Sequence, residues 1–266
     1  MRIGLLMFLA VAAYVLLALI LYIMQRRLMY HPMGGRVSPG SLGLKGVEEI
    51  IVKTRYTKRL LAWYVPAQPG RPTFLYFHGN AGSLASRAAR LDFYRQQGYG
   101  VLLTTYRGFS GSSGHPAEFP IKMDALYFYH WLQARGVKER DIVLYGESLG
   151  TGVAVATAFN HHPGAVILEA PYSSIVDVGA SRFPFMPVRW FMKDRYDSMA
   201  LIGQLTAPLF IVHGEQDRVI PVHLARKLFA AANQPKEAVF LRDAAHNDLY
   251  SHGAFELIAG FLARHL

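Results

Sequence analysis

A long apolar stretch occupies the amino-terminal end of the chain. Residues 4–24 contain no charged side chain, whereas Arg2 precedes them and Arg26 and Arg27 follow them. At about 1.5 Å per residue this stretch forms a helix about 31 Å long, enough to cross the hydrocarbon core of a bilayer. A cleaved signal peptide has a shorter apolar region and a small-residue cleavage site. The pattern therefore predicts an uncleaved transmembrane anchor over residues 1–27.

Beyond the anchor, short apolar runs alternate with longer helical patterns. Residues 28–47 are rich in glycine and proline and predict a connector. The alternating segments 48–56 and 59–65 predict a two-stranded β-hairpin. The strands expected after it are 73–77, 101–105, 141–145, 165–169, 208–213 and 238–241. The expected helices are 83–97, 121–135, 148–159, 221–232 and 253–264. This order predicts an α/β catalytic domain over residues 48–266, with a mainly parallel central sheet and helices on both faces.

The chain is basic, with a formal net charge of +10, and it contains no cysteine. Its basic residues are scattered and match no nucleic-acid-binding module, so no nucleic-acid partner is expected. A protein tethered to anionic lipid, or a generally basic proteome, accounts for the charge equally well. The absence of cysteine excludes disulfides, thiolate metal sites and cysteine nucleophiles, but it does not choose a compartment.

The distribution of positive charge around the anchor predicts its orientation. Arg26, Arg27 and Arg36 follow the apolar stretch, and only Arg2 and the terminal amine precede it. The excess of positive charge on the cytoplasmic side of membrane helices favours a single-pass protein with a cytoplasmic catalytic domain.

A glycine–serine pattern gives the first candidate for catalysis. Ser148 lies in Gly146-Glu147-Ser148-Leu149-Gly150, between a predicted strand and a predicted helix. This is the nucleophile elbow of serine hydrolases, in which the flanking glycines permit a tight turn that exposes the hydroxyl. Serine is a weak nucleophile at neutral pH and needs a base to take its proton, which predicts activity that falls at acid pH if the base is histidine.

The partners of such a serine are expected downstream, in the order acid and then histidine. Asp217 follows the strand 208–213 and is the candidate acid, and His246 follows the strand 238–241 and is the candidate general base. Other carboxylates compete for the role of the acid, namely Glu215, Asp243, Asp248 and Asp177. The adjacent His213 is expected to be a packed core residue.

The loop His78-Gly79-Asn80-Ala81-Gly82 follows the strand 73–77. In this architecture that loop supplies one N–H of the oxyanion hole, and the residue after the nucleophile supplies the other. The backbone N–H groups of Asn80 and Leu149 are therefore the predicted donors. No phosphate-binding or dinucleotide-binding glycine pattern is present, so no cofactor is expected. The pair His161-His162 is expected in a solvated loop rather than at a metal.

In order and spacing, these four motifs resemble the alpha/beta-hydrolase superfamily. The chain is most similar to membrane-anchored serine hydrolases related to protein depalmitoylases and to monoacylglycerol and lysophospholipid lipases. The segments 106–114 and 170–174 also match that branch, and the resemblance extends from Glu48 to the carboxyl terminus. It implies an alpha/beta-hydrolase fold, an ester or thioester hydrolase, and Asp217 as the acid through its Gly-x-x-Asp spacing. Arg107, in the first of these segments, is expected to brace a loop.

The resemblance also implies a cap over the active site, here a short aromatic and proline-rich segment over about residues 178–204. We expect it to line an acyl-chain pocket or to dip into the membrane interface; the alternative is an ordinary helix and loop. The expected partners are therefore a membrane and a lipid-like or acylated substrate. A serine peptidase and a non-catalytic membrane-tethered binding module are the competing functions.

Overall fold

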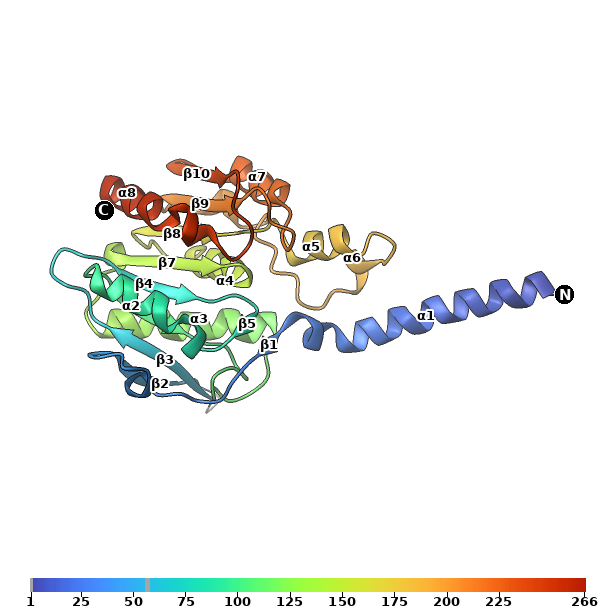
Figure 1. The fold of residues 1–266 in the computed structure, drawn as a ribbon, viewed down its shortest axis with the longest axis horizontal. Helices are drawn as coiled ribbons and strands as arrows, with labels where there is room; N and C mark the ends of the chain where they lie inside the picture. Colours follow the sequence, from blue (N-terminus) through green and yellow to red (C-terminus); the bar gives the residue numbers. More distant parts are fainter. Residues whose placement is uncertain (1, 56–57) are drawn as a thin grey trace.

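A central sheet forms the middle layer of the domain (Figure 1). The structure, a computed structural model, describes residues 2–55 and 58–266. Within those residues the sheet has eight strands in the order β10-β9-β8-β7-β4-β6-β3-β2, and β3 runs antiparallel to both of its neighbours. The strands are β2 (Glu48–Lys53), β3 (Arg59–Val65), β4 (Thr73–Phe77), β6 (Gly100–Thr104), β7 (Ile142–Glu147), β8 (Ala165–Glu169), β9 (Leu209–Gly214) and β10 (Lys236–Leu241). The predicted mainly parallel sheet is confirmed, although Tyr56, the predicted end of the first hairpin strand, lies outside the described residues.

Helices cover both faces of the sheet, as predicted. One face packs against α3 (Glu118–Ala134), α4 (Leu149–Ala158) and α7 (Val222–Ala231). The other packs against α2 (Ala88–Gln96) and α8 (Ala254–His265). Two apolar cores result, one on each side of strands whose residues are apolar on both faces, which is the pattern expected of a buried parallel sheet.

One predicted helix begins later than expected. The pattern predicted a helix over 83–97, but a short 3-10 turn at Ala85–Arg87 precedes α2. Ser83 and Ser86 explain the difference, because their hydroxyls bind backbone groups of this turn and so compete with regular helical hydrogen bonding.

The amino-terminal helix α1 spans Arg2–Met29 and projects from the domain (Figure 1). Its 28 residues are long and apolar enough to cross a membrane, and none of them is buried by the protein. The helix continues past the predicted limit of residue 27 and ends where Tyr30 enters the core. The Tyr30 hydroxyl lies 3.0 Å from that of Tyr196 and 3.2 Å from Asp194.

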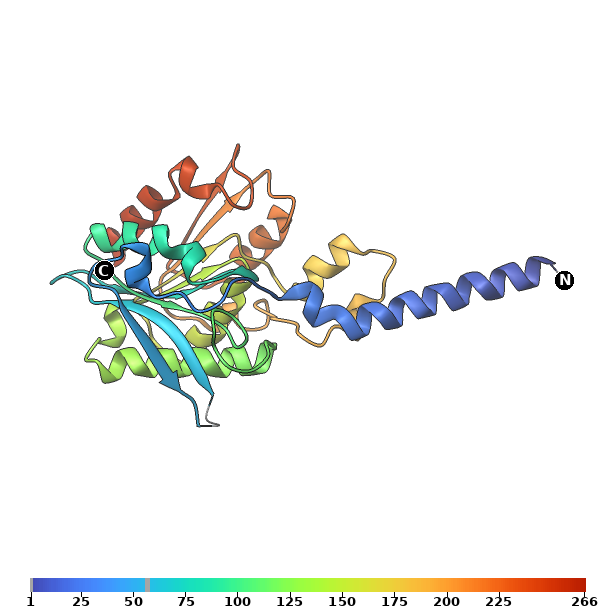
Figure 2. The same ribbon diagram turned by 60° about the horizontal axis from the view of Figure 1, so that its bottom comes forward.

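The connector after α1 is tied to the loop that follows β4. The two-residue strand β1 (His31–Pro32) pairs in parallel with β5 (Ala81–Gly82). The predicted cap segment contains the end of α5 (Ile175–Arg182), the short helix α6 (Val188–Phe191) and loops. In both views it lies beside the half of α1 that is nearest to the domain (Figures 1 and 2).

Candidate active site

The backbone around Ser148 has the geometry of a strained turn. Ser148 joins β7 to α4 with φ of 52° and ψ of −116°, a conformation that side-chain-bearing residues rarely adopt. A Cβ atom at Gly146 would lie 2.5 Å from the Cα of Thr151, and one at Gly150 would lie 2.1 Å from the carbonyl oxygen of Phe77. Both glycines are therefore required sterically, as the sequence analysis predicted.

The structure brings Ser148, His246 and Asp217 together at the carboxyl ends of β7, β10 and β9. The His246 Nε2 atom lies 3.0 Å from the Ser148 Oγ atom, and its Nδ1 atom lies 2.6 Å from the Asp217 Oδ2 atom. Because the carboxylate only accepts hydrogen bonds, Nδ1 carries the proton and Nε2 is free to accept one from the serine. This is the arrangement that a serine nucleophile needs.

The Asp217 carboxylate is held in place by four donors. Its Oδ1 atom accepts the N–H groups of Val219 and Ile220 at 2.7 and 2.8 Å. Its Oδ2 atom accepts from His246 and also lies 3.2 Å from the Nε2 atom of His213. Burial alone would raise the pKa of Asp217, but the hydrogen bonds from His213 and His246 outweigh it and hold that pKa well below its usual value.

His213 is a contact of the acid that the sequence did not reveal. It is fully buried at the end of β9, as expected of a packed core residue. Its Nε2 atom also lies 3.0 Å from the carbonyl of Ile220, which can only accept, so Nε2 must carry the proton. Within the described part of the chain its Nδ1 atom has no hydrogen-bond partner. The His213 Nε2–H group therefore supports Asp217 from within the core.

Three of the four competing carboxylates have other partners. Glu215 pairs with Arg226, and Asp177 accepts from Ser173 at 2.6 Å and from Arg189 at 2.9 Å. Asp248 accepts the N–H of Ala245 at 2.7 Å. In residues 2–55 and 58–266, Asp217 is the carboxylate that hydrogen-bonds to His246.

The two predicted oxyanion donors come from two different segments of the chain. Leu149 is the first residue of α4, where backbone N–H groups have no intrahelical partner. Asn80 lies in the loop after β4. Neither backbone N–H donates a hydrogen bond to any residue within the described ranges.

The other polar groups of Asn80 contact the end of α1. Its carbonyl accepts the N–H of His31 at 2.8 Å. Its side-chain amide donates to the carbonyl of Met29, also at 2.8 Å.

His78 shapes the start of this loop as an uncharged residue. Its ring packs against Tyr106, and its carbonyl accepts the Tyr106 hydroxyl at 2.5 Å. Its Nδ1 atom lies 2.6 Å from the carbonyl of Gly79. Burial, reinforced by the charge of Arg87, lowers the pKa of His78 to about 4, so the ring is neutral at pH 7.

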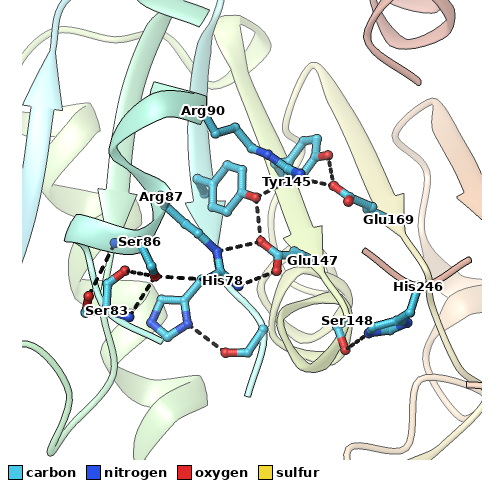
Figure 3. Close-up of polar contacts among 12 residues, drawn as sticks. His78, Ser83, Ser86, Arg87, Arg90, Tyr145, Glu147, Ser148, Glu169 and His246 are labelled. Atoms are coloured by element: carbon cyan, nitrogen blue, oxygen red, sulfur yellow. Dashed lines mark hydrogen bonds and ion pairs between the residues drawn. The ribbon is translucent and has the colours of Figure 1, made fainter. Parts of the chain in front are cut away.

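A network of charged residues lies beside the elbow (Figure 3). Glu147 points away from Ser148 and receives two hydrogen bonds from the Arg87 guanidinium, at 2.5 and 3.1 Å. Beside it, Arg90 contacts Glu169 at 2.5 Å. Burial would raise the pKa of Glu147, but the positive charge of Arg87 holds it below its usual value. Arg87 precedes α2, so this ion pair joins the segment after the Asn80 loop to the elbow.

This network was not predicted from the sequence. Glu147 occupies a variable position of the elbow pattern, and Arg87 is 60 residues away from it. The one signal available was a charged residue at the end of an otherwise apolar strand, which predicts a buried partner without naming it.

A small cavity opens beside the serine. It has a volume of about 30 Å³ and is lined by Ser148, His246, Asn247, Ala170 and three charged side chains of the network, those of Arg90, Glu147 and Glu169. A cavity of this size holds about one or two water molecules. Its charged walls make it unsuitable for an acyl chain.

The structure also places Arg107 and the pair His161-His162. Arg107 makes two hydrogen bonds with Asp124 of α3, at 2.5 and 2.7 Å, so it braces its loop as predicted. His161 and His162 follow α4 and hydrogen-bond to the Thr157 carbonyl and the Thr206 hydroxyl.

Comparison with known proteins identifies the family. No protein-family model matches the chain. It is 36% identical over 244 residues to an uncharacterised Mycobacterium tuberculosis protein, covering 90% of this chain and 87% of the relative. It is 32% identical over 263 residues to protein bem46 of Schizosaccharomyces pombe, covering 91% and 87%. The chain belongs to the alpha/beta-hydrolase superfamily.

Other members of the superfamily share parts of the chain or its fold. The lysophosphatidylserine lipase ABHD12 of Danio rerio is 34% identical over 197 residues, which cover 65% of this chain and 51% of that lipase. The chain thus spans about half of that relative. The Pyrococcus furiosus esterase Pf2001 superposes with a TM-score of 0.71 at 18% identity, over 89% of this chain and 98% of the esterase. These alpha/beta hydrolases confirm the predicted fold and support the predicted ester hydrolase.

Proposed function

We propose that this chain is a membrane-anchored serine hydrolase that cleaves an acyl ester or thioester through an acyl-enzyme on Ser148. The observation that carries the proposal is the continuous chain of hydrogen bonds from Ser148 through His246 to Asp217. An esterase fold and a lipase among the relatives add support.

In the first half of the reaction, the Ser148 Oγ atom attacks the substrate carbonyl while its proton passes to the His246 Nε2 atom. Asp217 stays ionised and stabilises the imidazolium. The N–H groups of Asn80 and Leu149 are the proposed donors to the negatively charged carbonyl oxygen. His246 then returns its proton to the departing alcohol or thiol, which leaves an acyl group on Ser148.

In the second half, a water molecule attacks the acyl group while His246 takes its proton. Collapse of the intermediate returns that proton to Ser148 and releases the carboxylic acid. No cofactor is needed for these steps.

We assign α1 as a single membrane anchor, residues 28–47 as a connector and residues 48–266 as the catalytic domain, with a cap near 178–204. The apolar composition of α1 and the absence of buried residues in it support the anchor. Arg26 and Arg27 at its domain end favour a cytoplasmic catalytic domain. An anchored enzyme of this kind meets lipid-like acyl substrates directly. The lysophosphatidylserine lipase among the relatives supports that substrate class.

The deciding experiment is labelling of the detergent-solubilised full chain with a fluorophosphonate probe, comparing wild type with Ser148→Ala. We expect the wild type alone to be labelled. A folded wild type that resists the probe would favour the alternative of a non-catalytic binding module.

Substrate class is then tested with ester, thioester and peptide-amide series of matched acyl groups. We expect esters or thioesters of long acyl chains to have the highest kcat/KM. A preference for the peptide amides would favour the serine-peptidase alternative.

A further inference from the structure

Residues 183–192, here called the cap hairpin, follow the surface of α1 for three turns. The Tyr14 hydroxyl donates a hydrogen bond of 2.9 Å to the carbonyl of Phe185. Closer to the domain, Gln25 donates to the carbonyl of Phe191 at 3.3 Å, and the rings of Tyr22 and Phe191 pack edge to face at 6.1 Å. Figures 1 and 2 show the same proximity from two directions.

The outer surface of the cap hairpin is apolar and exposed. Phe185 is 68% exposed, Trp190 85% and Phe191 53%. With Phe183, which is 41% exposed, four large aromatic side chains on ten residues form a patch that soluble surfaces rarely carry, and Trp is enriched where proteins meet the membrane interface. Because α1 exposes the same kind of surface beside it, the patch and the anchor form one continuous apolar face.

Most of the backbone N–H groups of the cap hairpin are satisfied by the protein, although within the described residues that of Phe185 has no partner. Pro184 and Pro187 have no N–H group to satisfy, and the N–H groups of Phe183, Met186 and Val188 donate to carbonyls within the segment or in α5, at 2.8 to 3.0 Å. In a bilayer core each unsatisfied backbone group is costly, and irregular backbone is tolerated where protein groups satisfy it. The Tyr14 and Gln25 side chains of α1 satisfy two more carbonyls.

Positive charges mark where the membrane surface would lie. Arg26 pairs with Asp194 at 2.8 Å, and the Lys193 ammonium lies 4.1 Å from the ring of Tyr22, so both cations are at the domain end of α1. Tyr14 is twelve residues before Arg26, about 18 Å further along the helix. The carbonyl of Phe185 is therefore well beyond the level of these charges.

We infer that the cap hairpin is a second membrane-inserted element, which enters the lipid beside α1 with Phe185 and Trp190 on the hydrocarbon side of the headgroups. The inference rests on the proposed role of α1 as the anchor. Two charged residues are compatible with it: Arg189 reaches back to Asp177 at 2.9 Å, and the exposed Arg182 has a side chain long enough to extend toward the headgroups.

The cysteine-free chain allows a direct depth measurement. Single cysteines are introduced as Phe185→Cys at the tip of the hairpin, Ala13→Cys in the middle of α1, and Gln133→Cys near the far end of α3. Each full-length variant carries a nitroxide label in vesicles of phosphatidylcholine and phosphatidylglycerol. Electron paramagnetic resonance then compares collision with oxygen, which concentrates in lipid, and with a water-soluble nickel chelate.

We expect the label at residue 185 to behave like the one at residue 13, with collisions favouring oxygen by about tenfold over those at residue 133. The inference would be overturned if the label at residue 185 had the same collision rates as the one at residue 133 while the label at residue 13 stayed protected from the chelate. The anchor would then still stand. If residue 13 were also accessible to the chelate, the anchor and the inserted hairpin would both be wrong.

A second variant tests the contact that holds the hairpin. Adding Tyr14→Phe to the Phe185→Cys chain removes the hydroxyl that binds the Phe185 carbonyl, without changing the apolar character of α1. We expect residue 185 to become measurably more accessible to the nickel chelate. If the label at residue 185 is as accessible to the chelate as the one at residue 133, both with and without Tyr14→Phe, insertion is again contradicted.

Discussion

The side-chain amide of Asn80 hydrogen-bonds to the carbonyl of Met29, the last residue of α1. The backbone N–H of the same residue is a proposed oxyanion donor. One residue therefore links the end of α1 to a proposed oxyanion donor.

Replacement of Asn80 by alanine tests this connection. We expect Asn80→Ala to lower the free energy of unfolding by about 1 kcal/mol and to reduce kcat with little change in KM, because the donor acts mainly in the transition state. Asn233→Ala is the matched control, since that amide also donates to backbone carbonyls, those of Gly203 and Leu205, but far from the serine. Equal kcat values for the two variants would show that the Asn80 amide does not position the loop.

The assignment of the acid predicts a large effect at one carboxylate and none at its neighbour. Asp217→Asn should lower kcat by about 10⁴, because an amide cannot hold His246 in the required tautomer. Glu215→Gln, two residues earlier, should leave kcat unchanged, since Glu215 pairs with the surface residue Arg226. Steady-state hydrolysis of a soluble ester measures both variants. A similar loss in the two would mean that the acid is assigned wrongly.

The ion pair beside the elbow predicts a strong coupling in stability. Glu147→Gln leaves the Arg87 guanidinium without its counter-charge, which we expect to cost about 3 kcal/mol. Arg87→Gln combined with Glu147→Gln should recover part of that loss, because neither charge then remains buried alone. Chemical denaturation of the two single variants and the double variant measures the coupling.

The exposed pair of Arg264 and Glu237 serves as a control for that cycle. Glu237→Gln should cost less than about 1 kcal/mol, since solvent screens exposed ion pairs. Additive effects at Arg87 and Glu147 would show that their contact contributes nothing to the fold.

The lowered pKa of His78 predicts that the protein loses stability in mild acid. Its pKa is lowered to about 4 in the folded protein, so between about pH 6.5 and pH 4 the unfolded chain binds a proton that the folded protein does not. The stabilisation is fully present above pH 6.5 and is lost as the pH falls toward 4, by about 3 kcal/mol in total. Denaturation across this range should give a flatter pH dependence for His78→Gln than for wild type. His223→Gln, at an exposed position of α7, should change nothing.

Features that depend on neighbouring residues were predictable from the sequence. The elbow is an example: the close backbone contacts that require Gly146 and Gly150 arise within one turn around Ser148. The spacing of these three residues in the sequence is therefore enough to predict the turn. The strands of the parallel sheet were equally visible, because strands buried on both faces are apolar throughout. The ends of these strands differ from the prediction by one or a few residues, because the last hydrogen bond of a strand depends on the strand that pairs with it.

Contacts between distant segments were not predictable in this way. Tyr14 and Phe185 are 171 positions apart, and nothing in either local pattern indicates the other. The same holds for His213, whose strand position predicted burial correctly but gave no sign that it would contact Asp217. Such pairings are set by the order of strands in the sheet and by where α1 leaves the domain.

The placement of α1 at the carboxyl edge of the sheet, where the triad also lies, has a consequence for how the rate should be described. If α1 anchors the protein as proposed, the enzyme meets an ester dissolved in the bilayer as a two-dimensional pool. Its turnover should then follow the mole fraction of substrate among the lipids. Adding inert phospholipid would slow the reaction even though the number of substrate molecules in the tube stays the same.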